Sequence, residues 1–358
     1  MKGTSRTKLL GGTKLLGGLV AATVAAAVAV TTPGCAGGAT ETEDGKQVIR
    51  FGSVGGLTDA GLYLAEARGY FEDAGLKVEP QRMAGGSEIT TAVATGNLEV
   101  AGFAVTAGLF NGAAQQLNAK VVGDKQSVTS ESSATRLVAE KSLVEGDLAA
   151  TLHNLKGKRV GVSDKKSATM VMLDTLLKKH GMSVDDVKVE QLAYPEMTAS
   201  LIKGKLDAAI ELEPFLTAAL DSGKVKEVSD LSETVPADGG TLVPLVYSQS
   251  FIDDNRGAGQ RFMNAYMRGV RDYNDAFTKN KDKDEVARII AKAADQPVKT
   301  VLAANVAGLD PNQRVGREFL ADTQQWFVDN KLVNEPVKVD KLFDDSFAKR
   351  AVKKLGTY

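Results

Sequence analysis

The sequence is poor in the residues on which most metal and redox chemistry depends. Its 358 residues contain one cysteine and two histidines, so neither an intrachain disulfide nor a Cys/His metal site is expected. Phosphate-binding loops and the Gly-x-Ser-x-Gly and His-Glu-x-x-His motifs are also missing from it. The sequence therefore predicts a protein that is not an enzyme, with no catalytic residues, no bound metal and no cofactor.

Neither sign of charge is in excess, since the formal net charge is -1. The basic residues Lys2, Arg6, Lys8 and Lys14 fall in residues 1–34, which contain no acid, so the remainder is mildly acidic. Proteins that bind nucleic acid usually present a basic face, and no nucleic-acid partner is expected here. The length leaves room for about two domains.

Long apolar runs are missing except near the N-terminus. There, residues 15–30 carry no charge, follow the basic residues and precede a stretch of small residues. This order predicts a secretory signal peptide over residues 1–34. A transmembrane helix is the alternative, but the run is shorter than the roughly 20 apolar residues that cross a bilayer.

The single cysteine stands at the expected cleavage point. Gly34-Cys35 resembles the lipobox of bacterial lipoproteins, whose cysteine becomes the lipidated first residue. Thr32 and Pro33 depart from the usual residues of that motif, so a plain signal peptide is the alternative. Residues 35–47 are small and polar, as suits a lipid-anchored tether. We expect an extracytoplasmic protein, anchored by lipid to the outer face of the cell membrane or periplasmic.

Two series of strands and helices follow, the pattern of α/β domains. The predicted strands are residues 48–54, 77–83, 98–104, 120–124, 135–139, 159–163, 187–192 and 206–212. The predicted helices are residues 62–74, 87–95, 167–180, 197–203, 214–221, 261–277, 284–294, 298–307 and 318–330. We expect two lobes, each a mainly parallel sheet flanked by helices, with a helical C-terminal tail. Residues 48–130 and 241–358 would form lobe I, and residues 131–240 lobe II, with a hinged cleft between them.

Several phrases resemble the nitrate/sulfonate/taurine-type solute-binding proteins of ABC transporters. They are GLYLAEARGYFEDAGLKVE at 61–79, AVATGNLEV at 92–100, LKGKRVGV at 155–162, ASLIKGKLDAA at 199–209 and Glu213-Pro214-Phe215. The resemblance spans residues 48–220. It implies a type II periplasmic binding protein-like fold with a small-molecule ligand between the lobes. It further implies delivery to a membrane permease with a cytoplasmic ATPase, and we expect a monomer.

Candidate ligand-binding residues follow from the rule that ligands bind beyond the carboxyl ends of strands in open α/β sheets. Glycines there permit close backbone approach, and helix starts offer free N–H groups, although simple N-capping by serine is an alternative. Tyr194 can stack on a flat ligand or pack between the lobes. The candidates are Gly55, Thr58, Gly85, Gly86, Ser87, Phe103, Thr106, Ser163, Ser167, Thr169, Tyr194 and Glu213.

The charge of the ligand stays open at this point. Helix starts favour an anion, whereas a carboxylate from Glu211 or Glu213 would favour an amine, amidine or heteroaromatic N–H. We expect at least one of these glutamates to point to solvent, because strand neighbours alternate. The expected function is capture of a small polar molecule, such as a sulfonate, carboxylate or heteroaromatic, for import. A sensory lipoprotein and a pyrimidine-synthesis-type enzyme are the alternatives; the enzyme would be expected to need histidine and cysteine in its site.

Overall fold

The computed structural model describes Thr42 and residues 45–115 and 119–358. The predicted signal peptide, Cys35 and most of the predicted tether lie outside these residues. Among the helices of the described ranges, none combines the length and the apolar character that crossing a membrane requires.

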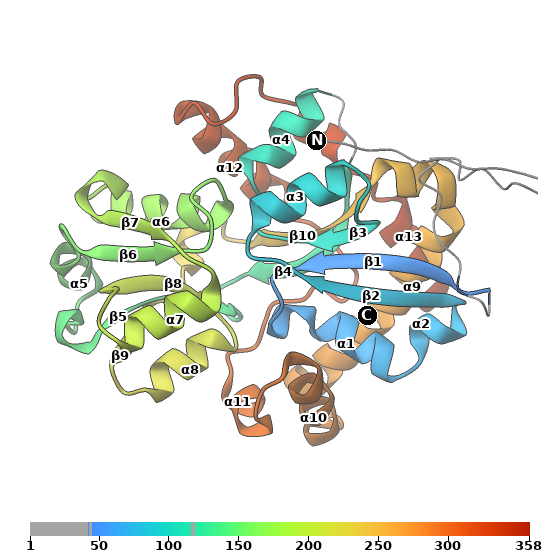
Figure 1. The fold of residues 1–358 in the computed structure, drawn as a ribbon, viewed down its shortest axis with the longest axis horizontal. Coiled ribbons are helices and arrows are strands. Elements are labelled where there is room, and N and C mark those ends of the chain that lie inside the picture. The colour runs from blue at the N-terminus through green and yellow to red at the C-terminus, as the bar shows by residue number, and fades with distance from the viewer. Residues whose placement is uncertain (1–41, 43–44, 116–118) are drawn as a thin grey trace, which may run out of the picture. The chain divides into compact units, whose positions relative to one another are not determined.

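Two five-stranded sheets organise the chain, with strand orders β2-β1-β3-β10-β4 and β7-β6-β8-β5-β9 (Figure 1). The first sheet contains β1 (Gln47–Ser53), β2 (Leu76–Arg82), β3 (Val100–Gly102), β4 (Ala119–Val128) and β10 (Gly240–Ser248). The second contains β5 (Thr135–Glu140), β6 (Arg159–Val162), β7 (Lys188–Gln191), β8 (Ala208–Leu212) and β9 (Val225–Ser229). The chain passes between the sheets through residues 129–134 and 230–239.

Each sheet has the same pairing pattern. β1 pairs in parallel with β2 and β3, and β10 pairs antiparallel with β3 and β4. In the second sheet, β6 pairs in parallel with β7 and β8, and β5 pairs antiparallel with β8 and β9. The predicted α/β fold with two sheets is confirmed. Four of the five strands in each sheet run in the same direction, and the strand that enters each sheet from the other, β10 or β5, runs against its neighbours.

Helices cover both faces of each sheet. Those associated with the first sheet are α1 (Ala60–Ala67), α2 (Tyr70–Asp73), α3 (Gly86–Ala94), α4 (Ala107–Ala114), α9 (Gln249–Lys279), α10 (Lys283–Ala294), α11 (Val298–Ala303), α12 (Arg317–Asp329) and α13 (Ser346–Leu355). Those of the second are α5 (Leu148–Asn154), α6 (Ala168–Lys179), α7 (Tyr194–Ile202) and α8 (Phe215–Asp221). Short 3-10 turns span Leu57–Asp59, Lys141–Leu143, Val184–Asp186, Ser232–Thr234 and Val339–Leu342.

Local differences from the predicted elements have identifiable causes. The helix predicted over residues 62–74 is split into α1 and α2 at Gly69, whose φ of 71° lies in the left-handed region. Helix α9 starts at Gln249 instead of residue 261, because the Ser248 hydroxyl caps it by accepting from Phe251 N at 3.2 Å. Five helices and strands were not predicted: α4, α5, α13, β9 and β10.

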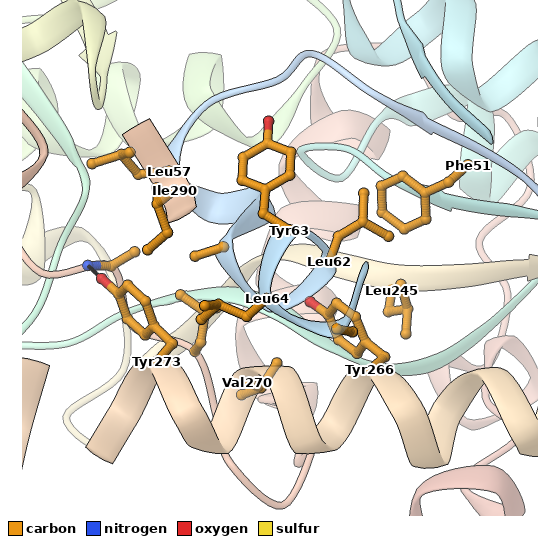
Figure 2. Close-up of a cluster of buried hydrophobic side chains, with 14 of the residues drawn as sticks. Phe51, Leu57, Leu62, Tyr63, Leu64, Leu245, Tyr266, Val270, Tyr273 and Ile290 are labelled. Atoms are coloured by element: carbon orange, nitrogen blue, oxygen red, sulfur yellow. Dashed lines mark hydrogen bonds between the residues drawn. The ribbon is translucent and has the colours of Figure 1, made fainter. Parts of the chain in front are cut away.

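The packing of α1 against α9 positions the start of α1 beneath the first sheet (Figure 2). The two helix backbones are in direct contact, since a Cβ on Gly269 would lie 2.1 Å from the Gly61 carbonyl oxygen. Leu62, Leu64 and Val270 are buried around this contact. Thr58 and Asp59, at the N-terminal end of α1, are each 1% exposed.

Candidate functional site

A small pocket with both polar and apolar lining residues lies between the two sheets. It encloses about 20 Å³, which is room for roughly one water molecule. The first sheet and its helices and loops supply Val54, Thr58, Gly86, Gly102, Phe103, Ala104, Lys125, Gln126, Leu242 and Val243 to its lining. The second sheet and its helices and loops supply Thr135, Ser163, Asp164, Ser167, Thr169, Tyr194 and Leu212.

Direct hydrogen bonds between the two halves close this pocket. Ser87 N donates to Asp164 Oδ2 at 2.9 Å. Ala107 N donates to the Lys166 carbonyl at 2.9 Å, and Ala168 N donates to the Val105 carbonyl at 2.6 Å. The structure is therefore a closed arrangement of the two halves.

Seven of the candidate ligand-binding residues line the pocket. They are Thr58, Gly86, Phe103, Ser163, Ser167, Thr169 and Tyr194. The rule about carboxyl ends of strands thus selected residues that come from five separate loops, after β1, β2, β3, β6 and β7. That each of them touches a ligand stays a prediction.

Four further candidates from the first-sheet loops lie beside the pocket rather than in its lining. The Arg82 side chain covers Gly55, because a Cβ placed on Gly55 would lie 3.4 Å from Arg82 Nε. Gly85 faces the Ser163 carbonyl oxygen, which would lie 3.5 Å from a Cβ placed on Gly85. Ser87 is exposed and contributes its backbone N–H to Asp164. Thr106 is buried and caps α4 by accepting from Leu109 N.

Glu213 holds two parts of the chain together. Its carboxylate accepts hydrogen bonds from Thr217 N and Oγ1 at 3.1 and 2.7 Å, and from Asn305 N at 2.9 Å. Its carbonyl accepts from Leu57 N at 3.1 Å. These contacts tie the end of β8 to the loop after β1 and to the segment after α11. Glu213 is absent from the pocket lining.

The expectation that Glu211 or Glu213 points to solvent is wrong. Both side chains are fully buried. Residues two apart along an extended chain face the same way, so the alternation of strand neighbours does not separate this pair. Glu211 accepts from Thr198 Oγ1 at 3.1 Å, and its Oε2 has no hydrogen-bond partner among the described residues. Burial raises the pKa of Glu211 to about 8.

Lys125 is a pocket residue that the sequence reasoning missed. Its side chain is 1% exposed, with Nζ 2.8 Å from Asp59 Oδ1 and donating to Thr58 Oγ1 at 3.0 Å. Asp59 Oδ2 accepts in addition from Ser53 Oγ at 2.7 Å. The aliphatic part of the lysine side chain passes over β3 at Gly102. A Cβ placed on Gly102 would lie only 2.0 Å from Lys125 Cδ, so a larger residue there would collide with the lysine. In the sequence, Asp124 and Lys125 are two charged residues inside an apolar run. This placement was the signal that could have identified Lys125 as a buried pocket residue.

Gln126 is the second missed residue. It is 1% exposed and lines the pocket beside Lys125. Its Nε2 donates to Thr135 Oγ1 at 2.8 Å, which joins β4 to the first residue of β5. Its Oε1 has no hydrogen-bond partner within the described part of the chain.

Tyr194 packs against protein as well as lining the pocket. Its ring stacks on Phe215, with centroids 5.8 Å apart and planes 7° from parallel. Burial raises its pKa to about 12, so the hydroxyl keeps its proton at neutral pH. The ring face that stacks on Phe215 is covered by protein.

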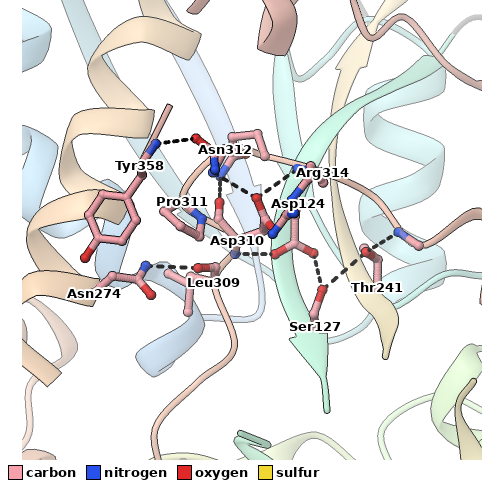
Figure 3. A network of polar contacts seen from close by, with 12 residues as sticks. Asp124, Ser127, Thr241, Asn274, Leu309, Asp310, Pro311, Asn312, Arg314 and Tyr358 are labelled. Atoms are coloured by element: carbon pink, nitrogen blue, oxygen red, sulfur yellow. Dashed lines mark hydrogen bonds and ion pairs between the residues drawn. The ribbon is translucent and has the colours of Figure 1, made fainter. Parts of the chain in front are cut away.

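A polar network stands near the chain crossings between the sheets (Figure 3). Asp124 accepts from Asp310 N at 3.0 Å and from Ser127 Oγ at 2.8 Å. The Thr241 hydroxyl accepts from Gly316 N at 3.0 Å. Complete burial raises the pKa of Asp124 to about 7. These hydrogen bonds connect residues 308–316 to β4 through Asp124 and to β10 through Thr241.

No cluster of three or more His, Cys, Asp or Glu suited to a metal ion occurs within residues 45–115 and 119–358.

Comparison with protein families finds the family described as NMT1/THI5 like, whose model matches residues 58–276, more than half of the chain. A curated relative is the 4-amino-5-hydroxymethyl-2-methylpyrimidine phosphate synthase of Aspergillus parasiticus, 28% identical over 154 residues. The match covers 43% of this chain and 42% of that protein, so it spans less than half of the relative.

Solved structures of the same fold include three whose names describe binding. The ligand-binding component of an ABC-type import system from Staphylococcus aureus, with zinc bound, has a TM-score of 0.69 and 17% identity, over 86% of this chain and 99% of that chain. The nitrate-binding protein of Synechocystis PCC 6803 has a TM-score of 0.67 and 13% identity, over 86% and 89%. The alkanesulfonate-binding protein of Xanthomonas axonopodis pv. citri, bound to MOPS, has a TM-score of 0.66 and 18% identity. The match covers 86% of this chain and 99% of that chain. These matches confirm the resemblance stated for the sequence and, at these identities, show the fold.

Proposed function

Because the chain belongs to the NMT1/THI5-like family, we propose that it is the extracytoplasmic solute-binding component of an ABC importer. It captures a small polar molecule between two lobes and delivers it to a permease with a cytoplasmic ATPase. The lobes comprise residues 48–130 with 241–358, and residues 131–240. The protein acts as a monomer held at the outer face of the membrane by lipid on Cys35.

The observation that carries this proposal is the pocket between the sheets. Residues from both halves line it, and direct hydrogen bonds between the halves close it. Two chain crossings, at 129–134 and 230–239, suit a hinge that opens and closes such a pocket. The names of structures with this fold, among them import, nitrate-binding and alkanesulfonate-binding proteins, support the same role.

A synthase is the second candidate function, because the curated relative carries that name. The pocket chemistry supports binding without turnover. Its described lining contains neither cysteine nor histidine, and its one lysine is engaged by Asp59 and Thr58. Turnover of the bound molecule by the purified protein would favour the synthase.

The only tryptophan of the chain provides a reporter of lobe opening. Trp326 Nε1 in α12 donates to Asp174 Oδ2 in α6 at 2.5 Å, so this bond joins a helix of the first sheet to a helix of the second (Figure 1). Native mass spectrometry of purified mature protein should identify a retained small molecule. Removing that molecule should shift tryptophan emission, and adding it back should restore the emission.

One control variant and one contradicting outcome make this experiment decisive. Trp326→Phe should abolish the emission signal while the protein still binds the molecule in calorimetry. A protein that retains no small molecule, and whose emission is unchanged by extracts containing candidate solutes, would contradict the proposed function.

Lipid anchoring predicts a second result. Cys35→Ala should release the protein from the membrane fraction, because the lipidated cysteine would be the only attachment. Mass spectrometry of the intact wild-type protein should find diacylglycerol on residue 35. Continued membrane association of the variant would show that another feature attaches the protein.

A further inference from the structure

The charges around the pocket do not suit an anion. Lys125 is the only cationic side chain among the described lining residues, and Asp59 compensates it at 2.8 Å. The other charged lining residue is Asp164, which is 3% exposed. An oxyanion that entered this pocket would lose its hydration and meet no uncompensated positive charge.

Two of the helix-start donors that favour an anion are already in use. Ser87 N at the start of α3 donates to Asp164, and Ala168 N at the start of α6 donates to the Val105 carbonyl. In the closed arrangement these N–H groups join the two halves. They are therefore unavailable to a sulfonate or nitrate oxygen unless closure is incomplete.

The pocket leaves an acceptor unsatisfied. Gln126, which is 1% exposed, lines the pocket, and its buried Oε1 has no hydrogen-bond partner among the described residues. A buried polar atom left unpaired costs about 1–3 kcal/mol, which a donor on a ligand would recover.

We propose that the pocket selects a compact ligand that donates N–H or O–H hydrogen bonds and carries no net negative charge, with Gln126 as a specificity-determining acceptor. This inference rests on the proposed function, since it names the ligand class of the same pocket. It assigns this chain a specificity different from the sulfonate and nitrate ligands named for structures of the same fold.

Matched pairs of small probes test the ligand class. Benzamide and benzoate have the same size, as do methanesulfonamide and methanesulfonate, and within each pair the first is neutral with N–H donors. Calorimetry on ligand-free protein should show the neutral member binding at least tenfold more tightly, or about 1.4 kcal/mol. Equal or tighter binding of the anion in either pair would overturn the proposal.

Variants of Gln126 test its role separately. Gln126→Leu removes the acceptor and should weaken benzamide binding about tenfold, whereas Gln325→Leu on the exposed surface of α12 should not change it. Gln126→Glu should strengthen binding of the benzamidine cation and weaken that of benzoate. Unchanged affinities in both Gln126 variants, with thermal midpoints near wild type, would remove Gln126 from the site.

If none of the probes binds, native mass spectrometry of the purified protein tests the proposal instead, through the chemistry of the molecule that the protein retains. A retained neutral or cationic donor would support the proposed class. A retained sulfonate, carboxylate or nitrate would overturn the class and leave the importer role standing. The absence of any retained molecule would instead count against the importer role and, with it, this inference.

Discussion

Replacing Asp59 by asparagine should lower the free energy of unfolding by about 3–5 kcal/mol, because it leaves a buried ammonium uncompensated. Lys125 and Asp59 are 1% and 2% exposed in their side chains, and their charged atoms are 2.8 Å apart. Asparagine has the same shape as aspartate and keeps an oxygen for Ser53, so the charge is the main change. Urea denaturation of the two proteins at neutral pH measures the difference.

Two controls separate the buried charge from a general effect of substitution. The double variant Asp59→Leu, Lys125→Met should recover much of the loss, since it removes both charges together. Lys156→Met breaks an exposed pair with Asp186, whose charged atoms are 3.4 Å apart, and should change stability by less than about 1 kcal/mol. An Asp59→Asn protein as stable as wild type would show that Lys125 is not buried as a charged group.

Stability should fall as pH rises from about 4.5 to about 8. Burial raises the pKa of Asp124 from 3.8 to about 7 and that of Glu211 from 4.5 to about 8. In this window the folded protein keeps protons that the unfolded chain releases, so the free energy of unfolding decreases with pH. Each pKa unit corresponds to about 1.4 kcal/mol, and the two groups together predict a decrease of several kcal/mol.

Acidic groups with lowered pKa values act in a different range. Hydrogen bonds from Arg159 lower the pKa of Asp207, so its contribution is lost only as pH falls below about 3.8. Denaturant unfolding at pH 5, 6.5 and 8 should therefore isolate the buried pair. Asp124→Asn and Glu211→Gln should each flatten the slope. Stability that is constant or increases from pH 5 to pH 8 would contradict the assignment.

Local sequence patterns were sufficient for much of the secondary structure. The strand expected at residues 159–163 is β6, and the helix expected at 167–180 is α6, because alternation of apolar residues and helix-start residues are properties of neighbouring positions. The same patterns placed Ser163 and Tyr194 at the carboxyl ends of strands. From there the general rule for α/β sheets was enough to bring both to the pocket.

Only the tertiary structure decided the polar contacts of the pocket. Lys125 reaches Asp59 because β4 belongs to the same sheet as β1 and because Gly102 leaves room for the lysine stem. The sequence by itself determined which loops could meet a ligand. It did not determine which donors and acceptors remain available. Asp164 and the Val105 carbonyl take the N–H groups of Ser87 and Ala168, and Gln126 Oε1 has no partner in the described part of the chain. Such pairings join residues far apart in the chain, and they exist only once the two sheets are in contact.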